Sequence, residues 1–88
     1  MEETRLAVQF PITDSTDFDS LIRIEDALTF AFLGGASAIV EGHDISQGKF
    51  SVLLSAKAPL DSVVDRIKVA LDEIGALKDA TIAHLPTL

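Results

Sequence analysis

Hydrophobic positions two residues apart run through the segment Leu6–Ile12. Such alternation is typical of a strand that is buried on one side. A second alternating segment, Lys49–Lys57, predicts another strand, and shorter apolar stretches predict strands over Ala36–Glu41 and Thr81–Leu85. The segment Gly42–Gly48 is predicted to join the two middle strands as a hairpin loop, longer than a tight two-residue turn.

Two further segments repeat their hydrophobic positions every three or four residues, which is the period of an amphipathic helix. The first predicted helix runs from about Asp17 to Leu33, and Gly34-Gly35 ends it. The second runs from Leu60 to Ile74 before Gly75. The apolar stripes consist of Leu21, Ile24, Leu28, Ala31 and Phe32 in the first helix, and of Leu60, Val63, Val64, Ile67, Leu71 and Ile74 in the second.

The predicted elements follow the order β-α-β-β-α-β, and 88 residues are enough for one domain. Right-handed crossovers would place both helices on one face of a four-stranded antiparallel sheet. Over nearly the whole chain this pattern resembles the ferredoxin-like superfamily, an α+β sandwich. The segment Glu41–Asp44, with Gly48 and the strand Phe50–Leu54, is also similar to hairpins of small uncharacterised bacterial domains. That second resemblance implies no function.

This arrangement leaves one face of the sheet uncovered. A face in contact with water more often carries Lys, Glu and Arg, whereas the side chains expected here are mostly small and uncharged. We therefore expect the face to pack against another surface, most simply a second copy in a homodimer. A weakly polar face exposed to water is the competing explanation. The residues expected on this face include Thr81 and the expected interface residues, which are Ala7, Gln9, Ser51, Leu53, Ser55, Ala83 and Leu85.

Acidic residues outnumber basic ones, with 14 Asp and Glu against seven Lys and Arg, for a net charge of −7. Nucleic acid repels such a surface, so we expect no nucleic-acid partner. A basic protein partner fits the charge, and an inhibitory or immunity-type role against such a partner is one specific version. The alternative is that the negative charge only keeps the domain soluble.

The chain has no cysteine, which excludes disulfides, thiolate metal sites and cysteine nucleophiles. No stretch approaches the roughly 18 apolar residues of a membrane span, and the N-terminal residues do not resemble a signal peptide. We therefore expect a cytoplasmic protein with no membrane partner. The glycines form no phosphate-binding or dinucleotide-binding motif, and no serine stands in a nucleophile elbow. We accordingly expect no cofactor and assign no catalytic residue.

The densest polar segment is Glu41-Gly42-His43-Asp44. Imidazole and carboxylate groups both bind metal ions, so Glu41, His43 and Asp44 are candidate ligands. A metal site usually needs three or four converging ligands, and no second histidine lies two or four residues away. The alternative is a structural hairpin in which Asp44 bonds to nearby amides.

Glu25 is an unusual residue in the first predicted helix, because it falls inside the apolar arc, about 40° from Leu21. A carboxylate there must reach the rim, find a partner or take up a proton. Glu25 therefore joins Glu41, His43 and Asp44 as a candidate site of a small enzyme or a metal- or ligand-binding domain, provided that the four converge on one cleft. A glutamate whose carboxylate simply reaches water is the alternative.

Functional branches of the ferredoxin-like superfamily leave marks that this chain lacks. Metal chaperones carry paired cysteines, RNA-binding members expose aromatic residues on the central strands, and acylphosphatases have a glycine-rich loop with an arginine after the first strand. The leading hypothesis is therefore a non-catalytic interaction or regulatory module that acts through protein contacts.

Overall fold

The computed structural model describes residues 4–35, 37–57 and 59–85. Within these ranges the chain forms the elements of an α+β fold in the predicted βαββαβ order. A 3-10 turn before the last strand was not predicted. The elements are β1 (Thr4–Pro11), α1 (Phe18–Ala31), β2 (Ala38–Ser46), β3 (Lys49–Ala56), α2 (Leu60–Glu73), the 3-10 turn η1 (Leu77–Asp79) and β4 (Thr81–Leu85).

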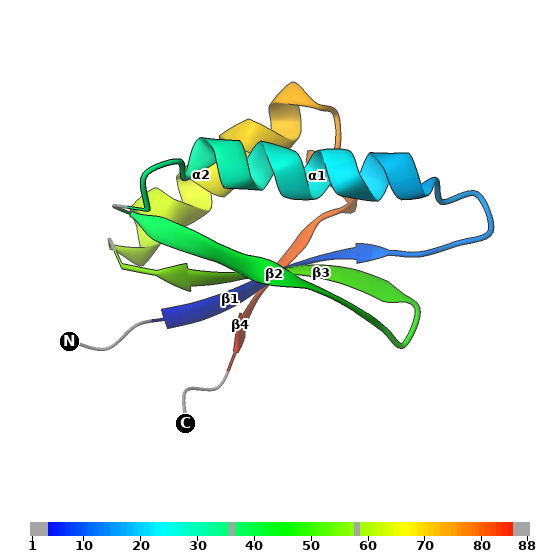
Figure 1. Ribbon diagram of the computed structural model, residues 1–88, viewed down its shortest axis with the longest axis horizontal. Coiled ribbons are helices and arrows are strands. Elements are labelled where there is room, and N and C mark those ends of the chain that lie inside the picture. Colours follow the sequence, from blue (N-terminus) through cyan, green and yellow to red (C-terminus); the bar gives the residue numbers. More distant parts are fainter. Residues whose placement is uncertain (1–3, 36, 58, 86–88) are drawn as a thin grey trace.

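The strands form one antiparallel sheet in the order β2-β3-β1-β4, so β1 and β3 are its two central strands. Both helices lie on the same side of this sheet (Figure 1). The ferredoxin-like architecture predicted from the hydrophobic pattern is confirmed. The opposite face of the sheet has no helix over it in the described chain (Figure 1).

The hydrophobic core fills the space between the helices and the sheet. The central strands β1 and β3 contribute every second side chain to this layer, and each helix contributes the stripe that its 3.6-residue period predicts. Leu28, Val63 and Val52, from three different elements, are fully buried. The core consists of Leu6, Val8, Phe10, Leu21, Ile24, Leu28, Phe32, Ala38, Phe50, Val52, Leu54, Ala56, Val63, Ile67 and Leu71.

The connection between β2 and β3 differs from its prediction. The prediction of a long loop over Gly42–Gly48 is wrong, because β2 continues to Ser46 and a two-residue turn, Gln47-Gly48, closes the hairpin. Both turn residues have positive φ, 53° and 72° respectively, which is the geometry of a tight hairpin turn. Ala36, where the strand was predicted to begin, lies outside the described residues.

A β-bulge in β2 explains why the strand was mistaken for a loop. Val40 lies opposite Leu54, but Gly42 rather than Glu41 lies opposite the next residue, Leu53. One extra residue in β2 therefore shifts every later side chain to the other face. Gly42 has φ 145°, a backbone conformation that residues with a side chain rarely adopt.

The uncovered face carries the residues that strand alternation assigned to it. Ala7 on β1 lies opposite Leu53 on β3 and Ala83 on β4. The neighbouring rows across the sheet have the same arrangement: Gln9 lies opposite Ser51 and Thr81, and Arg5 lies opposite Ser55 and Leu85. Ala7, Ser51 and Ser55 are 1%, 8% and 6% exposed, so the small side chains lie below the level of their neighbours.

Candidate functional site

One side of α1 faces the edge strand β2 rather than the middle of the core. Phe18, Ile22 and Glu25 are spaced by four and three residues, so they lie along one stripe of the helix. Asp17 caps the start of α1, and its side-chain oxygen accepts a hydrogen bond from the Asp19 amide at 3.1 Å. The cap fixes where the helix begins and therefore the direction in which this stripe points.

The bulge turns two side chains of β2 towards that stripe. After it, His43 lies opposite Val52 and Ile45 lies opposite Phe50. Val52 and Phe50 belong to the buried layer under the helices, and residues directly opposite each other in a sheet share a face. His43 and Ile45 therefore project to the helix side of the sheet.

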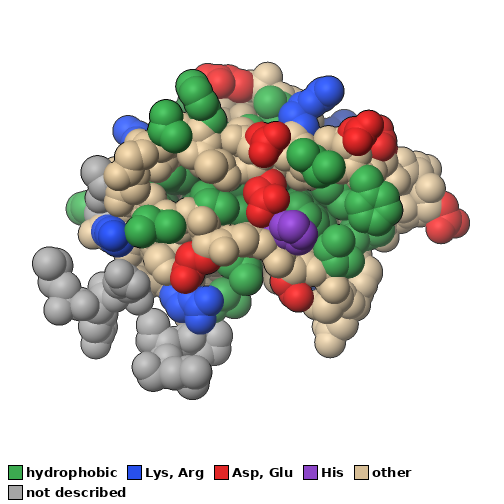
Figure 2. Space-filling view, in the orientation of Figure 1, with side chains coloured by type: hydrophobic (Ala, Val, Ile, Leu, Met, Phe, Trp, Pro, Cys, Tyr) green, Lys and Arg blue, Asp and Glu red, His purple; other side chains and the backbone are tan. Residues whose placement is uncertain are grey.

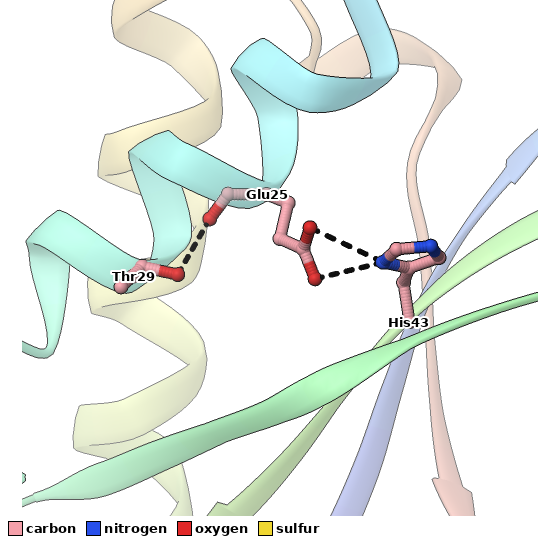
Figure 3. Close-up of polar contacts among 3 residues, drawn as sticks. All are labelled: Glu25, Thr29 and His43. Atoms are coloured by element: carbon pink, nitrogen blue, oxygen red, sulfur yellow. Dashed lines mark hydrogen bonds and ion pairs between the residues drawn. The ribbon is translucent and has the colours of Figure 1, made fainter. Parts of the chain in front are cut away.

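Glu25 and His43 meet between α1 and β2 (Figure 3). The Nδ1 atom of His43 is 3.0 Å from one carboxylate oxygen of Glu25 and 3.2 Å from the other. An ionised carboxylate can only accept hydrogen bonds, so Nδ1 carries the proton and donates it. The Nε2 atom lies on the far side of the ring from Glu25 (Figure 3), where in the neutral imidazole it is left as an acceptor for another molecule.

Both residues of this pair make further contacts. The Oγ1 of Thr29 donates a hydrogen bond to the backbone carbonyl of Glu25 at 2.9 Å, one turn further along α1 (Figure 3). The imidazole of His43 lies 5.4 Å from the Phe50 ring, centroid to centroid, at an interplanar angle of 37°. The side chains of Glu25 and His43 remain 25% and 49% exposed. The pair thus lies at the surface, where a ligand can reach it.

A mainly apolar cavity of about 260 Å³ adjoins the pair. Leu21 and Phe50 are buried parts of its lining, whereas Phe18, Ile22 and Ile45 are exposed. In Figure 2 a histidine and an acidic side chain lie beside a group of hydrophobic side chains on this face of the molecule. We call this cavity, with its lining residues Phe18, Leu21, Ile22, Glu25, His43, Ile45 and Phe50, the α1–β2 pocket.

Two of the four candidate ligand residues lie elsewhere. Glu41 accepts a hydrogen bond from the Ser55 hydroxyl at 2.7 Å and forms an ion pair with Arg5 at 3.5 Å. Both contacts are on the uncovered face. Asp44 lies opposite Ser51 on that same face and accepts a hydrogen bond from the Ser46 hydroxyl at 2.9 Å. The structure therefore brings together Glu25 and His43 and separates them from Glu41 and Asp44. In residues 4–35, 37–57 and 59–85, no three His, Cys, Asp or Glu side chains are grouped to hold a metal ion.

The apolar lining of the pocket was not predicted. Phe18 and Ile22 lie next to Glu25 at helical spacing, and that combination is the signal that could have identified a binding surface. Ile45 carried no such signal, because it lies in a polar segment whose strand character depends on the bulge.

A wider and shallower groove of about 620 Å³ runs between the two helices. Arg23 on α1 and Arg66 on α2 line it together with the acidic residues Asp26 and Glu73. Phe30 and Val69 in this groove are exposed by 77% and 59%. Its charged residues balance one another, so the groove favours no ligand of a particular charge.

Comparisons with known proteins show the fold and nothing more specific. No protein-family model matches the chain, and no curated protein matches it. Among solved structures, the chain is similar to the de novo designed protein Foldit4, with 18% sequence identity over 99% of this chain and 98% of that one, and a TM-score of 0.54. At this level of identity, the likeness to Foldit4 shows that the two chains share a fold.

None of the described helices is long and apolar enough to cross a membrane.

Proposed function

We propose that this protein is a non-catalytic interaction module that associates with a second copy of itself through the uncovered face of its sheet. The observation that carries the proposal is the composition of this face. At its centre Ala7 lies between Leu53 and Ala83, without a charged side chain. The charges of Arg5 and Glu41 on the same face are paired within the chain.

The size of the face is consistent with a reversible dimer. Strands of 8, 9, 8 and 5 residues, at about 3.3 Å per residue and a spacing of about 4.8 Å, give a footprint of about 475 Å² per copy. Two copies would bury about 1,000 Å², which is at the lower limit of specific protein interfaces. We therefore expect association in the micromolar range rather than an obligate dimer.

The small side chains at the centre favour pairing by a two-fold axis. Two sheets pack face to face at about 10 Å when their contacting side chains fit between one another. Ala7 and Ala83 leave shallow space on either side of the central strands, and Leu53 projects further, being only half-buried. In a two-fold arrangement Leu53 of each copy would fill the space over the alanines of the other.

The test is the oligomeric state of a Leu53→Lys variant. We expect the wild type to shift from monomer to dimer as its concentration rises from about 10 µM to about 1 mM, and the substitution to weaken the association at least about tenfold. Val69→Lys, which adds the same charge on the exposed surface of α2, is the control and should leave the association unchanged. Sedimentation velocity measures both. A wild type that stays monomeric throughout the series would refute the proposal.

The net charge of −7 supports a further part of the proposed function, an inhibitory or immunity-type role against a basic protein. Such a role requires a second surface, because a dimer already covers the open sheet face. The α1–β2 pocket is on the other side of the sheet and is available for it.

A further inference from the structure

Three large apolar side chains of the α1–β2 pocket are exposed to water. Phe18, Ile22 and Ile45 are 70%, 56% and 49% exposed. They come from α1 and from the bulged strand β2, which are separate in sequence, so their grouping is a product of the fold. A cluster of this kind is typical of a surface that another molecule covers.

The pocket is shaped to receive a projecting apolar group. Leu21 and Phe50 are 5% and 3% exposed and belong to the core, so they form a fixed floor. The exposed side chains surround this floor, and a cavity of about 260 Å³ can hold one large aliphatic or aromatic side chain of a partner. A single well-packed anchor of this kind often carries a large part of the binding energy of an interface.

The polar groups of the pocket favour a hydrogen-bond donor next to the apolar anchor. Because Glu25 fixes the proton of His43 on Nδ1, the Nε2 of the neutral imidazole is left to accept a hydrogen bond. The carboxylate of Glu25 adds a negative charge close to the pocket. A lysine or arginine beside the anchor would satisfy both groups.

The charge around the pocket also selects a basic partner. Residues 14–26, which include the start of α1, contain five acidic residues and one arginine. Asp14, Asp17 and Asp19 are exposed at the end of α1 that carries Phe18. Exposed acidic residues at one end of the pocket, together with Glu25 in its lining, attract cationic segments and disfavour anionic ones.

We propose that the α1–β2 pocket binds a basic amphipathic segment of a partner protein, with one apolar side chain of that segment in the cavity and its cationic side chains against Glu25 and the exposed acidic residues at the start of α1. The pocket lies on the helix side of the sheet, so this interaction is independent of self-association through the open face. It gives the inhibitory role of the proposed function a defined location.

The experiment uses a synthetic helical peptide of about 15 residues, with leucines on one face and lysines on the other. We expect wild-type protein to bind it with a micromolar dissociation constant in isothermal titration calorimetry. Ile22→Lys, which places a charge in the pocket, should weaken binding at least about tenfold. Val69→Lys carries the same added charge away from the pocket and should bind within about twofold of the wild type. Phe18→Ala, which leaves the charge unchanged, should also weaken binding.

Chemical-shift changes in NMR spectra locate the peptide. We expect them at Ile22, His43 and Ile45, and not at Phe30 in the groove between the helices. Equal weakening by Ile22→Lys and Val69→Lys, or shift changes centred on Phe30, would overturn the proposal. A lysine peptide without leucines that binds as tightly would also overturn it, because charge alone would then explain binding. So would hexylamine binding as tightly as the peptide, because the pocket would then be a small-molecule site.

The two proposals can fail separately. Leu53→Lys should bind the peptide as the wild type does while losing self-association. Ile22→Lys should associate with itself as the wild type does while losing the peptide. If Leu53→Lys abolished peptide binding, the pocket would depend on self-association, and the proposal that the two interactions are independent would be wrong.

Discussion

The uncovered sheet face and the α1–β2 pocket are both available surfaces of the same sheet, but they differ in side-chain size. On the sheet face, Ala7, Ser51 and Ser55 are less than 10% exposed although none of the described helices lies over them. At the pocket, Phe18 and Ile22 are large and are more than half exposed. The first surface is shallow and the second combines projecting side chains with a cavity.

Because their shapes differ, the two surfaces suit different partners. A shallow face made by regular strands is complementary to another shallow face, and a second copy of the chain supplies one. A cavity is complementary to a side chain that projects from a partner. The charges differ as well, because Arg5 and Glu41 pair with each other on the sheet face, whereas the pocket has Glu25 in its lining and exposed acidic residues at the nearby start of α1.

The largest expected effect is that of Gly42→Ala. Gly42 has φ 145°, and an added Cβ would meet no atom within 4 Å, so the cost is backbone strain rather than a clash. We expect the free energy of unfolding in urea to fall by about 1–2 kcal/mol. Because the bulge directs His43 towards Glu25, peptide binding should weaken as well. Self-association should persist, because the centre of the proposed interface lies on β1, β3 and β4.

Gly48→Asn is the matched control for that substitution. Gly48 also has positive φ, 72°, but in the left-handed region that asparagine tolerates in hairpin turns. Its effect on stability should be small. If Gly42→Ala were as stable as the wild type and kept full peptide binding, the bulge would not be what positions His43.

An effect of intermediate size is expected from salt, which should weaken peptide binding at the pocket but not self-association through the sheet face. Raising the ionic strength from about 50 mM to about 500 mM screens charges, so the basic peptide should bind about tenfold more weakly. Two copies with a net charge of −7 each repel one another, so the same change should leave self-association equal or stronger. Calorimetry and sedimentation at the two salt concentrations measure this contrast. Self-association that weakened with salt would show that ionic contacts hold the sheet faces together.

The smallest effect is expected from Glu25→Gln. The Glu25 and His43 side chains are 25% and 49% exposed, and a polar contact between side chains this exposed contributes about 0.5 kcal/mol or less. The glutamine oxygen can still accept the Nδ1 proton, so we expect nearly unchanged stability and about two- to threefold weaker peptide binding. His43→Ala is the companion variant for a double-mutant cycle. A loss of stability above about 2 kcal/mol would show that the pair is a structural element of the core.

The fold could be predicted from the sequence because its signals are local and agree with one another. The stripe that contains Leu21 and Leu28, and the alternation through Leu6 and Phe10, each specify both an element and its buried side. Adjacency of β1 and β3 and the placement of both helices on one face then follow from the handedness of the connections. These predictions are confirmed.

The candidate site could be predicted only in part, because its geometry depends on one irregular residue. Glu25 was selected for its position in the apolar arc and His43 for its neighbours, and the two do meet. Glu41 and Asp44 were grouped with them because these two carboxylates flank His43 in the densest polar segment. The bulge instead separates the side chains between two faces, and alternation cannot reveal an inserted residue.

The same bulge has a consequence for how the protein behaves at high concentration. β2 is an outer strand, and a long regular outer strand offers its free amides and carbonyls to any other exposed strand, which is a route to fibrils. The extra residue at Glu41-Gly42 interrupts that row of groups halfway along. A chain with exposed hydrophobic side chains on α1 and β2 can therefore remain dispersed without forming continuous intermolecular sheets.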